Sequence, residues 1–201
     1  MKKVLNPLFI LLVSLSFLNA QTHEEDVLEF QKELNEEYQD ESKSPLTKTD
    51  LRKFKGHDFF PIDEKFKVKA SFERVVDAVP FLMKTTTDRL PSYQLYGVAT
   101  FEIDNTSYQL NIYQNLQLLN NPEYRDYLFL PFTDLSNGED SYGGGRFIGL
   151  TIPEGDFITI DFNKAYNPYC AYNARYSCPI PPKENHLELR VEAGVRYEGH
   201  H

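Results

Sequence analysis

Two carboxylates lie in the part of the sequence with the most unusual polar residues, and both could take part in acid–base chemistry. Asp161 and Asn163 are two residues apart on an expected strand, so their side chains should share one face. Asp161 could then act as a general base or an oxygen ligand while Asn163 holds a substrate. Glu184, just before the last expected strand, would be the second member of the acid–base pair. The alternative is a buried group of side chains that only fixes the fold and therefore needs polar partners.

A glycine-rich string, Tyr142 to Arg146, suggests anion binding. Three consecutive glycines let the backbone approach a ligand closely, and exposed amides together with the Arg146 guanidinium could hold a carboxylate or phosphate. Tyr142, Gly144 and Arg146 are therefore candidate ligand-binding residues. The alternative is a tight bend entering a strand, with Arg146 paired to an internal carboxylate, for which Asp161 is the candidate. The string has no P-loop ending, and no strand–glycine–helix unit for a dinucleotide follows it.

The segment 163–185 is expected to form a loop held across one end of the sheet. Cys170 and Cys178 are the only two cysteines, and in an oxidising compartment their short spacing predicts a disulfide. Rigid turns that contain proline would stiffen the same loop. Asn167 and Asn185 are further candidate ligand-binding residues. The alternative is a cover over a sheet edge, in which the asparagines satisfy backbone groups of turns. No metal site and no cofactor are expected from these motifs.

Several long strings in this region resemble a known family. They are YGGGRF, IDFNKAYNPYCAY and SCPIPPKENHLEL, preceded by FKGHDFFPID. Together they resemble the signature of DUF1684, a domain family of unknown function, over residues 48–197. The sequence departs from the pattern at Tyr169, where a second proline before the cysteine is expected. The resemblance implies an exported or cytosolic bacterial or archaeal protein and brings no catalytic assignment.

The elements that must position these residues follow from hydrophobic periodicity. Residues 22–40 carry apolar side chains at three- and four-residue steps after a Thr22–Glu25 capping box, which predicts a helix, and a shorter helix is expected at 47–55. Beyond it the period changes to two, which is typical of half-buried strands. We expect strands at 66–72, 93–103, 106–114, 127–132, 146–152, 157–162 and 187–195. The pattern predicts a mainly β fold: an antiparallel barrel, roll or sandwich of about seven or eight short strands with one or two N-terminal helices.

The N-terminus has the pattern of a signal peptide. Lys2 and Lys3 precede an apolar stretch from Leu8 to Leu18, and Ala20 is a small residue at the expected cleavage position. The stretch is short for a bilayer span, so an uncleaved anchor is the less favoured alternative. Residues 1–20 are therefore expected to be removed, which leaves an exported protein that is soluble and not integral to the membrane.

After cleavage the chain divides into three parts. Residues 21–46 form the N-terminal helix and linker, 47–197 the β domain, and 198–201 a tail or the remnant of a tag. The whole chain has a net charge of −9, and loss of the two lysines leaves 19 basic residues against 30 acidic ones. Such an acidic chain is expected to be repelled by nucleic acid, so no nucleic-acid partner is expected.

Three functions remain open on this basis. The first is a module that binds a small polar or anionic ligand at the 142–185 surface. The second is a hydrolase-like enzyme that uses Asp161 and Glu184 as an acid–base pair. The third is a structural or envelope-interaction protein with no small-molecule site. Convergence of Arg146, Asp161 and Glu184 on an open pocket would favour a site, whereas burial with mutual hydrogen bonding would favour the structural alternative.

Overall fold

A computed structural model describes residues 21–197 of the chain. The expected signal peptide and the expected C-terminal tail lie outside the described residues. Within them, no helix is long and apolar enough to cross a bilayer.

Two helices precede the sheet, as the sequence predicts. Helix α1 (His23–Gln39) begins with the expected capping box, in which the Thr22 side chain accepts from the Glu25 amide and the Glu25 carboxylate accepts from the Thr22 amide. Helix α2 (Lys48–Leu51) is shorter than expected and is capped by Thr47.

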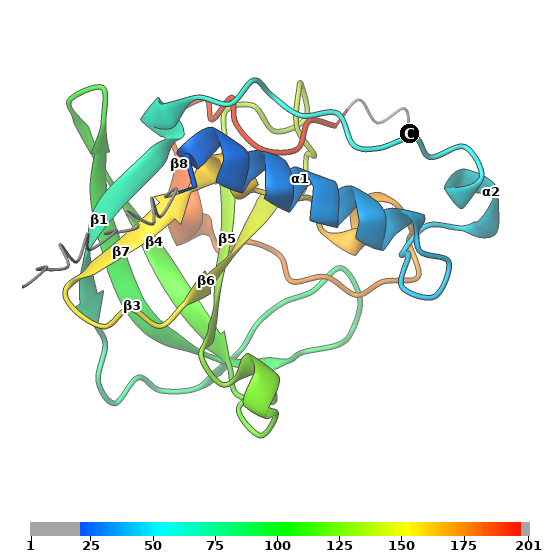
Figure 1. Cartoon of the computed structure of the whole chain (residues 1–201). Helices are drawn as coiled ribbons and strands as arrows, with labels where there is room; N and C mark the ends of the chain where they lie inside the picture. The colour runs from blue at the N-terminus through cyan, green and yellow to red at the C-terminus, as the bar shows by residue number, and fades with distance from the viewer. Residues whose placement is uncertain (1–20, 198–201) are drawn as a thin grey trace, which may run out of the picture.

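The rest of the chain is a curled antiparallel sheet, which confirms the predicted mainly β fold (Figure 1). Its strands are β1 (Lys67–Arg74), β2 (Phe81–Leu82), β3 (Ser92–Ile103), β4 (Thr106–Asn115), β5 (Tyr127–Asp134), β6 (Arg146–Thr151), β7 (Phe157–Asp161) and β8 (His186–Leu187). The strand order is β6-β5-β4-β3-β1-β7, with β2 added to β3 and the parallel strand β8 added to β5. The β3–β4 hairpin turns at Asp104 and Asn105, both with positive φ as expected. Short 3₁₀ helices fill the connections: η1 (Glu64–Phe66), η2 (Pro122–Tyr124), η3 (Phe162–Lys164), η4 (Tyr169–Ala171) and η5 (Lys183–Asn185).

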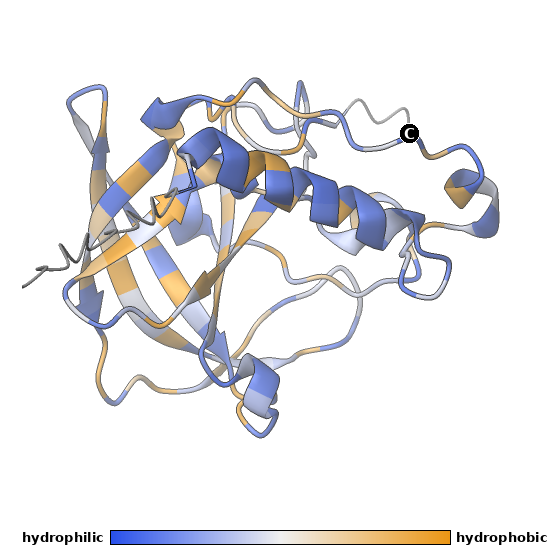
Figure 2. Ribbon diagram, viewed as in Figure 1, coloured by the Kyte–Doolittle hydropathy of each residue, from blue (hydrophilic) through white to orange (hydrophobic). Residues whose placement is uncertain are grey.

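The sheet is apolar on both faces over part of its width. Alternation along β5 sends Leu128, Leu130 and Phe132 to the larger core and Phe129 to a smaller one. The larger core draws residues from strands throughout the sheet, because curling brings their inner faces together. The smaller core contains Met83, Tyr93, Tyr113, Phe129 and Phe147. Figure 2 shows the resulting alternation of hydrophobic and hydrophilic bands along the strands.

The prediction of a strand over residues 187–195 is wrong beyond Leu187, where β8 ends. The alternating apolar residues are buried except Leu189, which is half-buried. Among the described residues, the backbone after β8 forms no strand ladder but only an isolated bridge between Val195 and Phe59. The carbonyls of Val191 and Ala193 instead accept hydrogen bonds from the side chain of Arg146, and the Val195 amide donates to Ala165. A buried arginine and the backbone of residues 58–60 therefore supply partners that a neighbouring strand would otherwise provide.

Helix α1 lies against the segment that joins β7 to the second half of the chain. Figure 1 shows it crossing the end of β7 and the beginning of β6. His23 Nε2 lies 2.8 Å from Asp161 Oδ2, and Lys164 Nζ lies 2.7 Å from Asp26 Oδ2. The strands β6 and β7 end the strand order on opposite sides, so α1 covers the place where the curled sheet does not close on itself.

Candidate functional site

Arg146 lies in the core and not at a ligand-binding surface. Its side chain has no exposed area, and Nη2 lies 2.8 Å from Asp134 Oδ2 and 2.8 Å from the carbonyl oxygen of Val191. Nη2 also lies 3.4 Å from Ser136 Oγ, and Nη1 donates a hydrogen bond to the Ala193 carbonyl. The expected pairing with Asp161 is therefore wrong, because Asp134 supplies the internal carboxylate. Burial lowers the pKa of Arg146, and the charge of Asp134 opposes that shift.

The three glycines before Arg146 form a bend into β6. Gly145 has a φ of +88°, and a Cβ there would lie 2.6 Å from the carbonyl oxygen of Phe132. Gly144 is exposed, and the ring of Tyr142 lies beside it. The Tyr142 hydroxyl points instead to the sulfur of Cys170 at 4.0 Å. These contacts favour the bend over an anion cradle.

Asp161 and Asn163 come together, but not on one strand face. Strand β7 ends at Asp161, which caps η3, so the predicted common strand face is wrong. Asp161 Oδ1 accepts from the Asn163 amide at 3.0 Å and from Asn163 Nδ2 at 2.9 Å. Asn163 also exchanges two hydrogen bonds with the backbone of Asp63. Because Oδ2 contacts His23, both carboxylate oxygens of Asp161 have polar partners within the fold.

Asn185 joins two strands, and Glu184 does not reach Asp161. Asn185 Oδ1 accepts from the Asn111 amide at 2.9 Å, while Nδ2 donates to the carbonyls of Asn111 at 2.8 Å and Pro131 at 2.7 Å. The side chain thus connects β4 to β5. Glu184 is exposed on the β4–β5 side, whereas Asp161 contacts α1. The predicted acid–base pair is not assembled.

Asn167 belongs to a buried polar chain. Its Nδ2 donates to the Tyr172 hydroxyl at 2.9 Å, and that hydroxyl lies 3.3 Å from His57 Nδ1. Asn167 Oδ1 and His57 Nε2 have no hydrogen-bond partner among the described residues. Burial in this aromatic surrounding, which includes Tyr38 and Phe54, lowers the pKa of His57 to about 4.

The two cysteines are adjacent free thiols, and the predicted disulfide is absent from the structure. The Cys170 amide donates to Cys178 Sγ at 3.2 Å. A hydrogen bond from the Cys178 thiol lowers the pKa of Cys170 to about 6, and the hydroxyls of Tyr142 and Thr86 act in the same direction. The same thiol–thiol hydrogen bond raises the pKa of Cys178. Both sulfur atoms are unbonded here but are held side by side.

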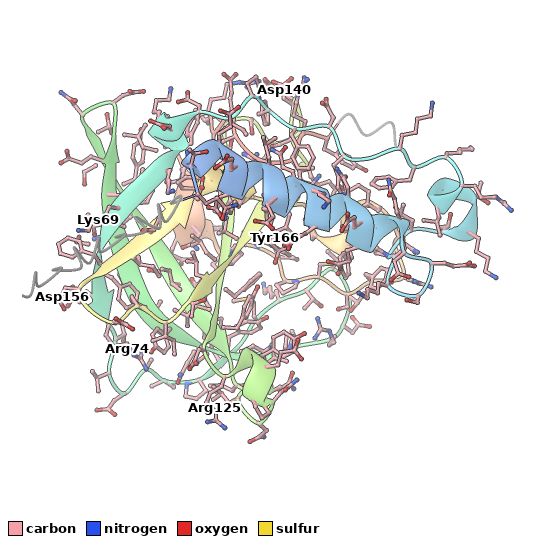
Figure 3. The ribbon with its side chains drawn as sticks, in the orientation of Figure 1. Lys69, Arg74, Arg125, Asp140, Asp156 and Tyr166 are labelled. Atoms are coloured by element: carbon pink, nitrogen blue, oxygen red, sulfur yellow. The ribbon has the colours of Figure 1, made fainter. Side chains whose placement is uncertain are left out.

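A pocket with the lining expected of a small-molecule site lies between α1 and the segment 166–179. It has a volume of about 420 Å³ and is lined by Phe30, Leu34, Glu37, Phe147, Tyr166, Pro168, Tyr169, Ser177, Cys178 and Pro179. Figure 3 shows Tyr166 directly beneath α1. The size is that of sites for small ligands, and the aromatic and aliphatic lining is typical of them.

A few polar groups lie among the rings of this α1 pocket. The Tyr169 hydroxyl donates to Glu37, and the Tyr166 hydroxyl lies 3.4 Å from that of Tyr127. Burial raises the pKa of Tyr169, and its contact with Glu37 adds to the shift. Both tyrosines therefore stay neutral, and the carboxylate of Glu37 is the charged group of the lining. Sequence periodicity identified α1 but did not reveal that the middle of its apolar stripe lines a pocket.

A second hollow lies on the exposed face of β1. It has a volume of about 560 Å³ and is lined on one side by Lys65, Lys67 and Lys69. Lys65 lies 3.7 Å from Asp104, and the Lys69 ammonium lies over the ring of Phe157. All three lysines are solvated surface groups, Lys65 in η1 and the other two on β1. Among the described residues, no group of three His, Cys, Asp or Glu side chains is placed to hold a metal ion.

The fold and the α1 pocket together define a small, curled β-sheet domain with a helix over its unclosed side. The chain belongs to the family described as "Protein of unknown function (DUF1684)", whose model matches residues 52–196. It is also similar to the solution NMR structure of an uncharacterized protein from gene locus rrnAC0354 of Haloarcula marismortui. That likeness has 31% identity and a TM-score of 0.70 and covers 89% of this chain and 96% of the other. No curated protein matches the sequence.

Proposed function

We propose that this is an exported binding protein for a small, mainly apolar molecule that carries a cationic group. The α1 pocket carries the proposal: a volume of about 420 Å³, four aromatic rings and one carboxylate. Apolar walls supply affinity through the burial of ligand surface. Aromatic faces beside a carboxylate suit an organic ammonium group.

The charge of the α1 pocket changes the ligand expected from the sequence. Arg146, which was to supply positive charge, is fully buried and paired with Asp134. Glu37 instead makes the lining negative, so an anion is disfavoured and a cation is favoured. The 142–185 surface still contributes through Tyr166, Tyr169 and Cys178.

Two further parts of the proposal concern the compartment. The basic, apolar and small-residue pattern of residues 1–20 supports export. In an oxidising compartment, the adjacent Cys170 and Cys178 thiols would be converted to the disulfide that their spacing predicts. The hydrolase alternative is not favoured, because both oxygens of Asp161 are engaged and Glu184 lies on another side of the sheet.

Calorimetric titration of the mature protein with three matched probes tests the proposal. Phenylpropylamine, phenylpropanol and phenylpropionate share one apolar part and differ in charge. The amine is expected to bind at least about tenfold more tightly than the carboxylate. Glu37→Gln should remove that preference while leaving the affinity for phenylpropanol unchanged. Equal affinity for the amine and the carboxylate would refute the cation-binding proposal.

A pair of tryptophan substitutions locates the binding. Leu34→Trp fills the α1 pocket, whereas Leu28→Trp places the same ring at an exposed position of the same helix. The first should abolish binding of the amine, and the second should leave it unchanged. The natural chain has no tryptophan, so fluorescence of the new ring reports directly on its burial. Equal binding by the two variants would show that the α1 pocket is not the site.

A further inference from the structure

Cys170 and Cys178 differ in exposure, although their sulfur atoms are adjacent. Cys170 is half-buried at the centre of η4, whereas Cys178 is buried and lies in the wall of the α1 pocket. The chain reverses between them, so that the Cys170 amide donates to Cys178 Sγ at 3.2 Å. Cys170 is therefore the more exposed of the two residues, and Cys178 is the more enclosed.

The surroundings of Cys170 also stabilise its thiolate. The Cys178 thiol donates a hydrogen bond to the Cys170 sulfur, and the Tyr142 hydroxyl lies 4.0 Å from the same atom. These contacts lower the pKa of Cys170 to about 6, while the pKa of Cys178 is raised. A half-buried thiolate beside a more deeply buried thiol is the arrangement of an attacking and a resolving cysteine.

We propose that Cys170 and Cys178 form a thiol–disulfide exchange site whose substrates are low-molecular-weight disulfides. The Cys170 thiolate attacks one sulfur of the substrate, which forms a mixed disulfide and releases one thiolate. Cys178 then loses its proton to solvent and attacks the Cys170 sulfur, which releases the second thiolate and closes the Cys170–Cys178 bond. The protein dithiol is oxidised by two electrons, and the substrate disulfide is reduced to two thiols.

This exchange site is independent of the proposed ligand. Its chemistry needs the two sulfur atoms and no occupant of the α1 pocket, so the two proposals fail separately. It also differs from a structural disulfide, which resists reduction by glutathione and stays closed. An exchange site opens and closes as the ratio of oxidised to reduced glutathione changes.

Mass spectrometry of the reduced mature protein with oxidised glutathione tests the site. Wild type should form the intramolecular disulfide, Cys178→Ser should accumulate glutathione on Cys170, and Cys170→Ser should do neither. Excess reduced glutathione should reopen the wild-type bond. An unreactive Cys178→Ser variant that melts like wild type would overturn the proposal. A wild-type bond that excess reduced glutathione leaves closed would also overturn it, by identifying a structural disulfide.

Alkylation of Cys170 by iodoacetamide supplies a second measurement that does not depend on bond formation. At pH 6 it should proceed about tenfold faster than alkylation of free cysteine, because the thiolate fraction is much higher. Tyr142→Phe should slow this reaction, whereas Tyr176→Phe, which changes a tyrosine outside these contacts, should not. The titratable and charged groups that interact with the two sulfurs include Tyr142, Tyr197, Tyr38 and Arg89. An alkylation rate equal to that of free cysteine would show that Cys170 is not activated.

Discussion

Arg146 Nη2 and Asp134 Oδ2 lie 2.8 Å apart, and neither side chain has any exposed area. The same guanidinium donates to the carbonyls of Val191 and Ala193, so one side chain connects β5, β6 and the C-terminal segment. A buried charge of this kind is tolerated only while its partners remain.

Removal of the Asp134 carboxylate should therefore be severe. We expect Asp134→Ala to lower the free energy of unfolding by about 3–5 kcal/mol, because it leaves the Arg146 charge buried and unpaired. Urea unfolding followed by circular dichroism measures the change. Arg190→Ala is the control: its ion pairs lie at the surface, so its loss should cost far less than the loss of the buried pair. Equal effects of the two substitutions would contradict the buried-pair interpretation.

Substitution of Asn185 should destabilise the fold, whereas substitution of its neighbour Glu184 should have little effect. Asn185→Ala removes three hydrogen bonds to the backbones of β4 and β5, and the orphaned buried groups should cost about 2–3 kcal/mol of stability. Glu184→Ala changes an exposed side chain and should stay within about 0.5 kcal/mol. The midpoints of urea denaturation compare the two. A Glu184→Ala variant as unstable as Asn185→Ala would be inconsistent with this geometry.

Asp161 should behave as a structural residue. Asp161→Asn replaces an oxygen that accepts hydrogen bonds in a buried cluster, so we expect a loss of about 1–3 kcal/mol in unfolding free energy. Asp156→Asn, at an exposed turn, is the matched control and should change little. Calorimetric melting distinguishes them. An Asp161→Asn variant with an unchanged melting temperature would contradict the structural role and make Asp161 a candidate site residue again.

His57 should make the stability depend on pH in a defined window. Its pKa is about 4 in the folded protein and about 6.5 in an unfolded chain, so between these values only the unfolded chain takes up the proton. Stability should therefore fall by up to about 3 kcal/mol as the pH drops from 6.5 to 4, and this contribution should be constant above 6.5. His57→Phe should flatten that part of the curve, while His186→Gln, an exposed histidine, should not. The test is urea unfolding at a series of pH values, and an unchanged slope in His57→Phe would exclude His57 as the cause.

Local sequence signals predicted the elements well. The capping box before α1 and the Asp104–Asn105 turn depend on neighbouring residues, and both are confirmed. The alternation in 187–195 was misleading, since it encodes burial but not the hydrogen-bond partner. The partner of the Val191 and Ala193 carbonyls is Arg146, more than forty residues earlier in the chain.

The pocket was harder to predict than the sheet. The apolar stripe of α1 predicted one packed face, yet only Val27 and Tyr38 of this helix are buried. The residues between them, Phe30 and Leu34, line the α1 pocket. Periodicity indicates which side of a helix faces inward. It does not reveal the α1 pocket, because that pocket depends on how the 166–179 segment packs.

The position of α1 in the chain has a consequence for the family as a whole. The family match begins at residue 52, so the α1 wall of the pocket, including Glu37, precedes the matched residues. Tyr169, which contacts Glu37, lies within the matched residues. Relatives that keep the same sheet but change these two residues would select different molecules. Under the proposed function, ligand choice would then depend on a short N-terminal segment and one turn position, both outside the strands of the sheet.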